Sequence, residues 1–203
     1  MSTPGNRETS GGRPLRADAR TNRERILNVA EQVFGKGGRS ASTEEVARLA
    51  GVGVATVFRH FPTKAALLEA VLVQRFDRLR EQAEALSRAP DPGAAFFGFF
   101  SRLVADAAGK IAISEALLDA GSADGGAAVQ ASDGLRRAVG TLLRNAQHVG
   151  AVRGDVELPE VYALLVATSR ARPEKEVRDR MLAIVFDGLT SGAGAGTFRT
   201  AGR

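Results

Sequence analysis

One stretch, residues 42–64 (STEEVARLAGVGVATVFRHFPTK), constrains the fold more than any other part of the chain. Ser42 or Thr43 can cap a helix here, and Glu45 completes an S-x-x-E capping box. The residues of this helix expected to face inward are Val46, Leu49 and Ala50. The spacing therefore predicts a short amphipathic helix that ends at Gly51.

A second short helix is predicted over about residues 54–61. Gly51 and Gly53 precede it, and both can adopt positive φ, so the chain can reverse direction within three residues. The inner side is expected to carry Val57, Phe58 and Phe61, which leaves Ala55, Thr56, Arg59 and His60 outside. Pro62 forbids continuation, and Thr63 can cap the next helix. Two short helices joined by a tight turn match the helix-turn-helix motif of DNA-binding proteins.

The charge is concentrated at one end of the chain. Residues 1–64 contain 11 Lys and Arg against 6 Asp and Glu, whereas residues 65–203 contain 17 of each, so the net charge of +5 belongs to the N-terminal third. A basic module on a neutral body predicts a polyanionic partner. A basic disordered tail without a partner is the alternative that charge alone leaves open.

Several classes of protein are disfavoured by what the sequence lacks. The chain has no Cys, which removes disulfides, thiolate metal sites and Cys nucleophiles. No HExxH, G-x-S-x-G or glycine-rich phosphate loop is present, so we expect no catalytic site, metal or cofactor. The first twenty residues lack an apolar run, and the longest apolar cluster is too short to span a bilayer. We therefore predict a cytoplasmic protein without a membrane partner.

The whole chain has helical spacing and no convincing period-2 strand, which predicts an all-α protein. We expect a three-helix DNA-binding domain over residues 17–64 and a helical ligand-binding and dimerisation domain over residues 65–189. The tails, residues 1–16 and 190–203, are predicted to be disordered. Within the second domain, separate helices are expected around residues 64–88, 96–104, 111–118 and 135–148, and from Pro159 and Pro173.

The segments NRERILNVAEQVFGKGG and STEEVARLAGVGVATVFRHFPTKAALLEAV closely resemble the N-terminal domain of the tetracycline-repressor (TetR) family of bacterial transcription regulators. The resemblance covers about Arg20 to Val71. It implies a homodimer whose two recognition helices enter successive major grooves of operator DNA. It also implies a C-terminal domain that binds a small molecule and thereby changes the spacing of those helices.

The resemblance assigns phosphate contacts to Thr43 and Lys64, and base contacts to the exposed side of the second short helix. The predicted DNA-binding residues are Thr43, Val54, Ala55, Thr56, Phe58, Arg59, His60 and Lys64. The family often has Tyr at Phe58 and a polar residue at Val54. Val54 and Ala55 could instead contact thymine methyl groups. Arg59 is then the best candidate for a bidentate hydrogen-bond contact with guanine. Core packing for Phe58 and Phe61, and plain solvation for Arg59 and His60, remain open, as does minor-groove contact by Arg13, Arg16 and Arg20.

In family terms, the second domain should enclose a largely apolar effector. The candidate lining residues are Phe97, Phe100, Leu117 and His148. Core packing is the alternative role for the phenylalanines, and a solvated helix end is the alternative for His148. The two last helices are candidates for a four-helix interface with a second copy of the chain. The residues expected there are Val161, Leu165, Val177, Met181, Ile184 and Val185, with packing inside one subunit as the alternative.

The sequence thus predicts a ligand-responsive homodimeric repressor of a pseudo-palindromic operator. Two alternatives stay open: a DNA-binding protein without effector, constitutive or architectural, and, from another class, a helical enzyme. Activation in place of repression also fits the motif.

Overall fold

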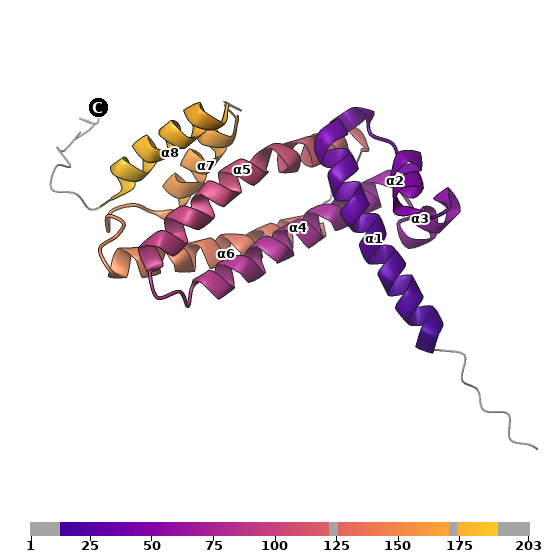
Figure 1. Ribbon diagram of the computed structural model, residues 1–203, viewed down its shortest axis with the longest axis horizontal. Coiled ribbons are helices and arrows are strands. Elements are labelled where there is room, and N and C mark those ends of the chain that lie inside the picture. The colour runs from indigo at the N-terminus through magenta and orange to yellow at the C-terminus, as the bar shows by residue number, and fades with distance from the viewer. Residues whose placement is uncertain (1–12, 122–125, 171–173, 191–203) are drawn as a thin grey trace, which may run out of the picture. The chain divides into compact units, whose positions relative to one another are not determined.

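The chain is all-α, as predicted. The computed structural model describes residues 13–121, 126–170 and 174–190, with residues 13–17 as backbone alone. These ranges hold eight α-helices, one 3-10 turn and no strand (Figure 1). Most of the two tails expected to be disordered, residues 1–12 and 191–203, lies outside the described residues. Residues 13–16, however, belong to helix α1 (Arg13–Gly37). Pro14 lies in the first turn of this helix, where proline is tolerated.

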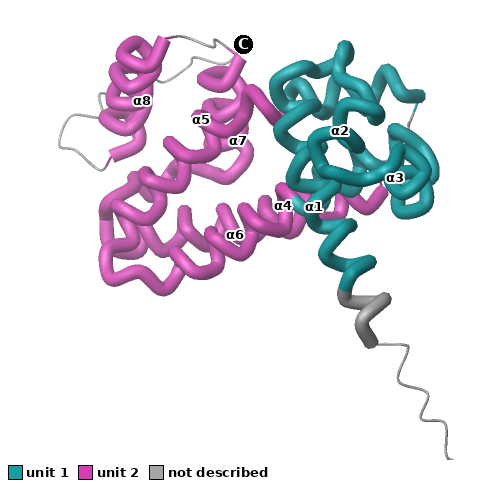
Figure 2. Tube along the Cα trace, turned by 45° about the vertical axis from the view of Figure 1, so that its right-hand side comes forward, with its two compact units in different colours: residues 1–74, 111–125 teal, residues 75–110, 126–203 magenta. Residues whose placement is uncertain are grey.

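Two compact units make up the described chain (Figure 2). Unit 1 comprises residues 13–74 and 111–121, and unit 2 comprises residues 75–110, 126–170 and 174–190. Helices α4 (Lys64–Leu86) and α5 (Pro92–Asp119) each belong partly to unit 1 and partly to unit 2. The domain boundary expected after residue 64 falls at the start of α4, inside unit 1.

Unit 1 is built on the apolar stripe of α1. The apolar residues Ile26, Leu27, Ala30, Val33 and Phe34 follow the i, i+3, i+4, i+7 spacing of one helix face and are buried. The core of the unit includes Ile26, Leu27, Ala30, Val33, Phe34, Val46, Val57, Leu67, Leu68, Val71 and Ile113. At the end of α1, Gly38 takes a positive φ of 51° at the start of the 3-10 turn η1 (Gly38–Ser40).

Helices α2 (Thr43–Ala50) and α3 (Val54–His60) form the predicted helix-turn-helix. Ser42 caps α2, since its Oγ accepts a hydrogen bond from the Glu45 amide at 3.1 Å. Gly51 ends α2 with φ 66°, whereas Gly53 is extended at φ −69° and needs no left-handed freedom. Thr63 caps α4 as expected, because its Oγ1 accepts from the Ala66 amide at 3.0 Å.

Unit 2 contains the rest of α4 and α5 together with α6 (Gly126–His148), α7 (Leu158–Arg170) and α8 (Lys175–Leu189). The expectation of separate helices around residues 96–104 and 111–118 is wrong, because α5 is continuous across both. Val104 and Ile111 are seven residues apart, about two turns, so the apolar stripe keeps its phase. Gly109 between them costs only about 1 kcal/mol relative to Ala, and no Pro interrupts the helix.

An ion pair between a buried arginine and a partly exposed aspartate joins α4 to α5 within unit 2. The Arg75 side chain is 6% exposed, and its Nη2 lies 2.7 Å from Asp106 Oδ2. The same guanidinium donates to the Asp106 carbonyl. A buried guanidinium is tolerated only when it is paired and hydrogen-bonded, and Asp106 supplies both contacts to Arg75.

Candidate nucleic-acid interface

The outer side of α3 carries four of the predicted DNA-binding residues. Val57 is fully buried and defines the inner side of the helix. At 100° per residue, Ala55 and Arg59 lie opposite Val57, while Phe58 and Thr56 flank them on either side. Ala55, Phe58 and Arg59 are exposed, and Thr56 is half-buried. The helix therefore presents one contiguous outward face over its whole length.

Phe58 is the clearest departure from the sequence analysis within this face. The periodicity placed it on the inner side, yet its side chain is 40% exposed, and only Val57 and the helix cap Phe61 point into the core. A seven-residue helix completes fewer than two turns, so one buried side chain and one cap are enough to hold it in place. Val54 and His60 are half-buried at the two edges of the face.

Arg59 is exposed, and no acidic side chain of the described residues pairs with it. A neighbouring cation is held differently, because the Arg23 guanidinium of α1 stacks 5.1 Å above the Phe61 ring. The sequence analysis missed this contact, since it joins residues 38 positions apart that share no motif. Arg59 is therefore free to bind a partner, whereas the guanidinium of Arg23 also braces α1 against the end of α3.

Lys64 has an intramolecular partner that the sequence does not reveal. Its Nζ donates to the Ala41 carbonyl at 2.8 Å and lies 5.2 Å from the centre of the Phe34 ring. The side chain is half-buried and ties the start of α4 to the segment before α2. An ammonium group has three donors, so the contact with Ala41 leaves two for a phosphate oxygen.

Thr43 is placed differently from the expectation for a phosphate contact. The buried stripe of α2 consists of Thr43, Val46, Ala47 and Ala50, at i, i+3, i+4, i+7. Thr43 is 6% exposed as part of this stripe, and Leu49, expected to point inward, is 51% exposed. The phosphate contact assigned to Thr43 stays a prediction, and the backbone N–H groups at this helix start are also suited to an anion.

Two family models and several solved structures match most of the chain. A family model described as bacterial regulatory proteins, tetR family, matches residues 26–71. A second, described as transcriptional regulator SbtR-like, C-terminal domain, matches residues 91–191. The crystal structure of a TetR transcription regulatory protein from Mycobacterium vanbaalenii is 40% identical, covers 87% of this chain and 99% of its own, and has a TM-score of 0.73. The chain belongs to the TetR family.

Further relatives agree with this membership. The crystal structure of TetR transcriptional regulator SCO0520 from Streptomyces coelicolor is 30% identical over 83% of this TetR-family chain and 98% of its own, with a TM-score of 0.72. The HTH-type transcriptional regulator UidR of Escherichia coli K12 is 32% identical over 79 residues. The matched stretch spans 37% of UidR and 38% of this chain. The TetR-family chain is thus a transcriptional regulator with a helix-turn-helix DNA-binding domain.

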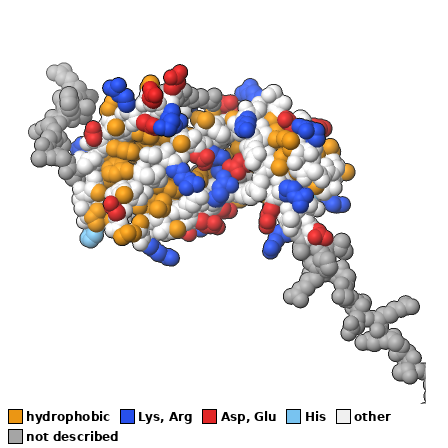
Figure 3. Space-filling view, in the orientation of Figure 1, with side chains coloured by type: hydrophobic (Ala, Val, Ile, Leu, Met, Phe, Trp, Pro, Cys, Tyr) orange, Lys and Arg blue, Asp and Glu red, His pale blue; other side chains and the backbone are white. Residues whose placement is uncertain are grey.

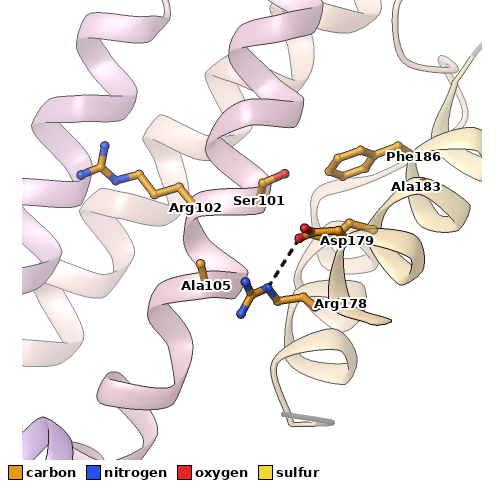
Figure 4. A pocket seen from close by; sticks show the side chains of 8 residues that line it. Ser101, Arg102, Ala105, Arg178, Asp179, Ala183 and Phe186 are labelled. Carbon is orange, nitrogen blue, oxygen red and sulfur yellow. Dashed lines mark ion pairs between the residues drawn. The ribbon is translucent and has the colours of Figure 1, made fainter. Parts of the chain in front are cut away.

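Unit 2 of this TetR-family regulator carries an open groove of about 500 Å3 between α5 and α8. Its lining consists of Ser101, Arg102, Ala105, Arg178, Asp179, Leu182, Ala183 and Phe186. Figure 4 shows Arg178 reaching from α8 toward Ala105, while Arg102 points away from α8. The Arg178 Nε lies 3.9 Å from Asp179 Oδ1, and Asp179 also pairs with Lys175 at 2.7 Å, so the polar edge of the groove is already partly paired.

The four predicted effector residues are not brought together. Phe97 and Phe100 pack on Phe186 of the groove, with ring centroids 4.8 and 5.5 Å apart. Leu117 is buried in unit 1, and His148 is exposed at the end of α6. Of the four, only Phe97 and Phe100 therefore contact a residue that lines the groove, and they do so by packing their rings against Phe186.

The six predicted dimer residues divide into two groups. Val161 and Leu165 are 0% and 6% exposed, so they pack inside their own subunit. On α8, Val177 and Ile184 are 57% and 72% exposed, while Met181 and Val185 are half-buried. Exposed Val166 on α7 is a further apolar residue that the sequence analysis left out. In the region that α6–α8 occupy, Figure 3 shows hydrophobic side chains gathered on the surface.

Among residues 13–121, 126–170 and 174–190, no group of three or more His, Asp or Glu side chains is arranged to hold a metal ion. No helix in the same ranges is long and apolar enough to cross a membrane.

Proposed function

We propose that this regulator acts as a homodimeric repressor that binds a pseudo-palindromic operator and releases it when a small molecule binds unit 2. The observation that carries the proposal is Arg59, exposed on the outward face of α3 without a carboxylate partner among the described residues. An arginine in this position can donate two hydrogen bonds to O6 and N7 of guanine in the major groove.

The homodimer is supported by the apolar stripe of α8. Val177, Met181 and Ile184 are spaced i, i+4, i+7 and share one face, of which the first and last are more than half exposed. An exposed apolar stripe of this kind suits a second copy of the same helix related by a two-fold axis. The dimer would set two recognition helices about 34–36 Å apart, one turn of the duplex.

The effector proposal is supported by the groove between α5 and α8. Its volume of about 500 Å3 lies in the range of small-molecule sites. Leu182, Ala183 and Phe186 give it an apolar wall, so the effector should be largely apolar. Binding that favours a different spacing of the recognition helices would weaken operator affinity by about 1–3 kcal/mol.

The first test is fluorescence anisotropy of the full chain on DNA flanking its own gene, against random duplex of equal length, over a series of salt concentrations. Replacing Arg59 with Ala should cost about 1–3 kcal/mol on the operator and relax the preference at one base pair. The matched control is Arg88→Ala, which removes an exposed cation from unit 2 and should leave both affinities unchanged.

Three outcomes would contradict parts of the proposal. Equal losses on operator and random DNA for Arg59→Ala would exclude base reading by this residue. Equal, steeply salt-dependent binding of the native chain to both duplexes would favour an architectural DNA-binding protein. Operator binding that no small molecule weakens would favour a constitutive regulator.

A further inference from the structure

The outward face of α3 is divided lengthwise into an apolar and a polar half. Measured from buried Val57, Phe58 lies at 100° and Ala55 at 160°, whereas Arg59 lies at 200° and Thr56 at 260°. The first two side chains carry no hydrogen-bonding group, and the last two carry donors. A surface divided in this way contacts two different chemical groups along its length.

Phe58 is the large side chain of the apolar half. It is 40% exposed, while the other two phenylalanines nearby, Phe34 and Phe61, are 0% and 3% exposed. Single exposed apolar residues are common on protein surfaces. This one, however, stands beside exposed Ala55 and next in sequence to Arg59, on the face that the proposed function directs at base edges.

We propose that Phe58 and Ala55 read the 5-methyl group of thymine, so that each operator half-site carries a thymine near the base pair that Arg59 contacts. Among the four bases, only thymine presents a methyl group in the major groove. Residues 55–59 rise by about 6 Å along the helix, which corresponds to about two base-pair steps of 3.4 Å. The thymine is therefore within about two base pairs of the contacted guanine. This inference rests on the proposed operator binding.

The test deletes the methyl group from the DNA. Operators selected from random duplexes are resynthesised with single thymines replaced by deoxyuridine, and the full chain is titrated against them. At one or two thymines per half-site the native protein should lose about fourfold in affinity, as expected for one buried methyl group. In Phe58→Ala this loss should become clearly smaller, because only Ala55 still faces the methyl group. In Phe58→Leu, which keeps a large apolar side chain, it should persist.

The matched control is Leu118→Ala, which truncates an exposed apolar side chain of unit 1 outside α3 and should retain the native deoxyuridine penalty. A penalty of the same size in the native chain and in Phe58→Ala would overturn the inference, as would the absence of any penalty near the guanine. Either result leaves operator preference, and with it the proposed function, intact. If the native chain showed no preference for any operator over random DNA, both the proposed function and this inference would be overturned.

Discussion

Replacing Lys64 with Met separates two roles for one residue. The substitution keeps a long apolar stem and removes the ammonium group, which donates to the Ala41 carbonyl at 2.8 Å and lies over the Phe34 ring. Ala41 is only 4% exposed, so its carbonyl has little access to water once the donor is gone. The structure therefore predicts a loss of stability that has no connection with DNA.

The magnitude follows from the two lost contacts. A buried carbonyl left without a donor costs about 1–3 kcal/mol, and an ammonium over an aromatic ring contributes about 0.5–1 kcal/mol near a surface. Because Lys64 is half-buried, we take the lower part of each range and expect the free energy of unfolding to fall by about 2 kcal/mol.

Urea unfolding followed by far-ultraviolet circular dichroism measures this loss. Lys36→Met is the control, since Lys36 is exposed at the end of α1, and its replacement should change the free energy of unfolding by no more than about 0.5 kcal/mol. A pure phosphate contact would instead lower the salt dependence of DNA binding by about one unit in log–log slope. Unchanged stability with that lower slope would refute the structural role assigned here.

Two further substitutions test the turn between α2 and α3, and a titration of Tyr162 tests the burial of its phenol. Gly51→Ala should destabilise the chain by about 1–2 kcal/mol because φ is 66°, whereas Gly53→Ala, with φ −69°, should shift urea unfolding by less than about 0.5 kcal/mol; equal costs would contradict the assigned turn. Tyr162 is the only tyrosine, and burial raises its pKa to about 12 from an ordinary value of 10. Because the folded state favours the protonated phenol, Tyr162 contributes to the stability of the fold below pH 10. This contribution is lost as the pH rises through about 12. Near-ultraviolet absorbance should show that midpoint in the folded chain and one near 10 in urea, and a folded midpoint near 10 would disprove the burial.

Local signals in the helix-turn-helix were predictable because they depend on neighbouring residues alone. Capping by Ser42 and Thr63 needs only a hydroxyl one position before the helix and a free amide two or three residues later. The left-handed end of α2 needs a glycine, and Gly51 supplies it. These features are written in short stretches of sequence, and the structure has them where the sequence places them.

The inner and outer sides of α2 and α3 were harder to predict. In α2 the helical spacing predicted Val46, Leu49 and Ala50 on the inner side, yet the buried stripe takes Thr43 and Ala47 in place of Leu49. Small residues can face inward where two helices pack closely, and their low hydrophobicity does not reveal this position. The same limit applies to Phe58, because a helix of seven residues carries too few positions to define an apolar face.

The long-range contacts of the candidate sites could not be read from any motif. Lys64 bonds to a carbonyl 23 residues away, and the groove of unit 2 joins residues of α5 to residues of α8 more than 70 positions later. His148 was expected from the family resemblance to line the pocket, but it lies exposed at the end of α6. Which side chains meet depends on tertiary packing, and a single sequence does not specify it.

Helices α4 and α5 set a limit on how genes of this kind can be recombined. A crossover at residue 64 would separate Leu67, Leu68 and Val71 from the core residues of α1 with which they are buried in unit 1. Ile113, near the end of α5, belongs to the same core although it is encoded some forty codons later. Chimeras between related regulators are therefore expected to fold only when α1, the first half of α4 and the last turns of α5 come from one parent.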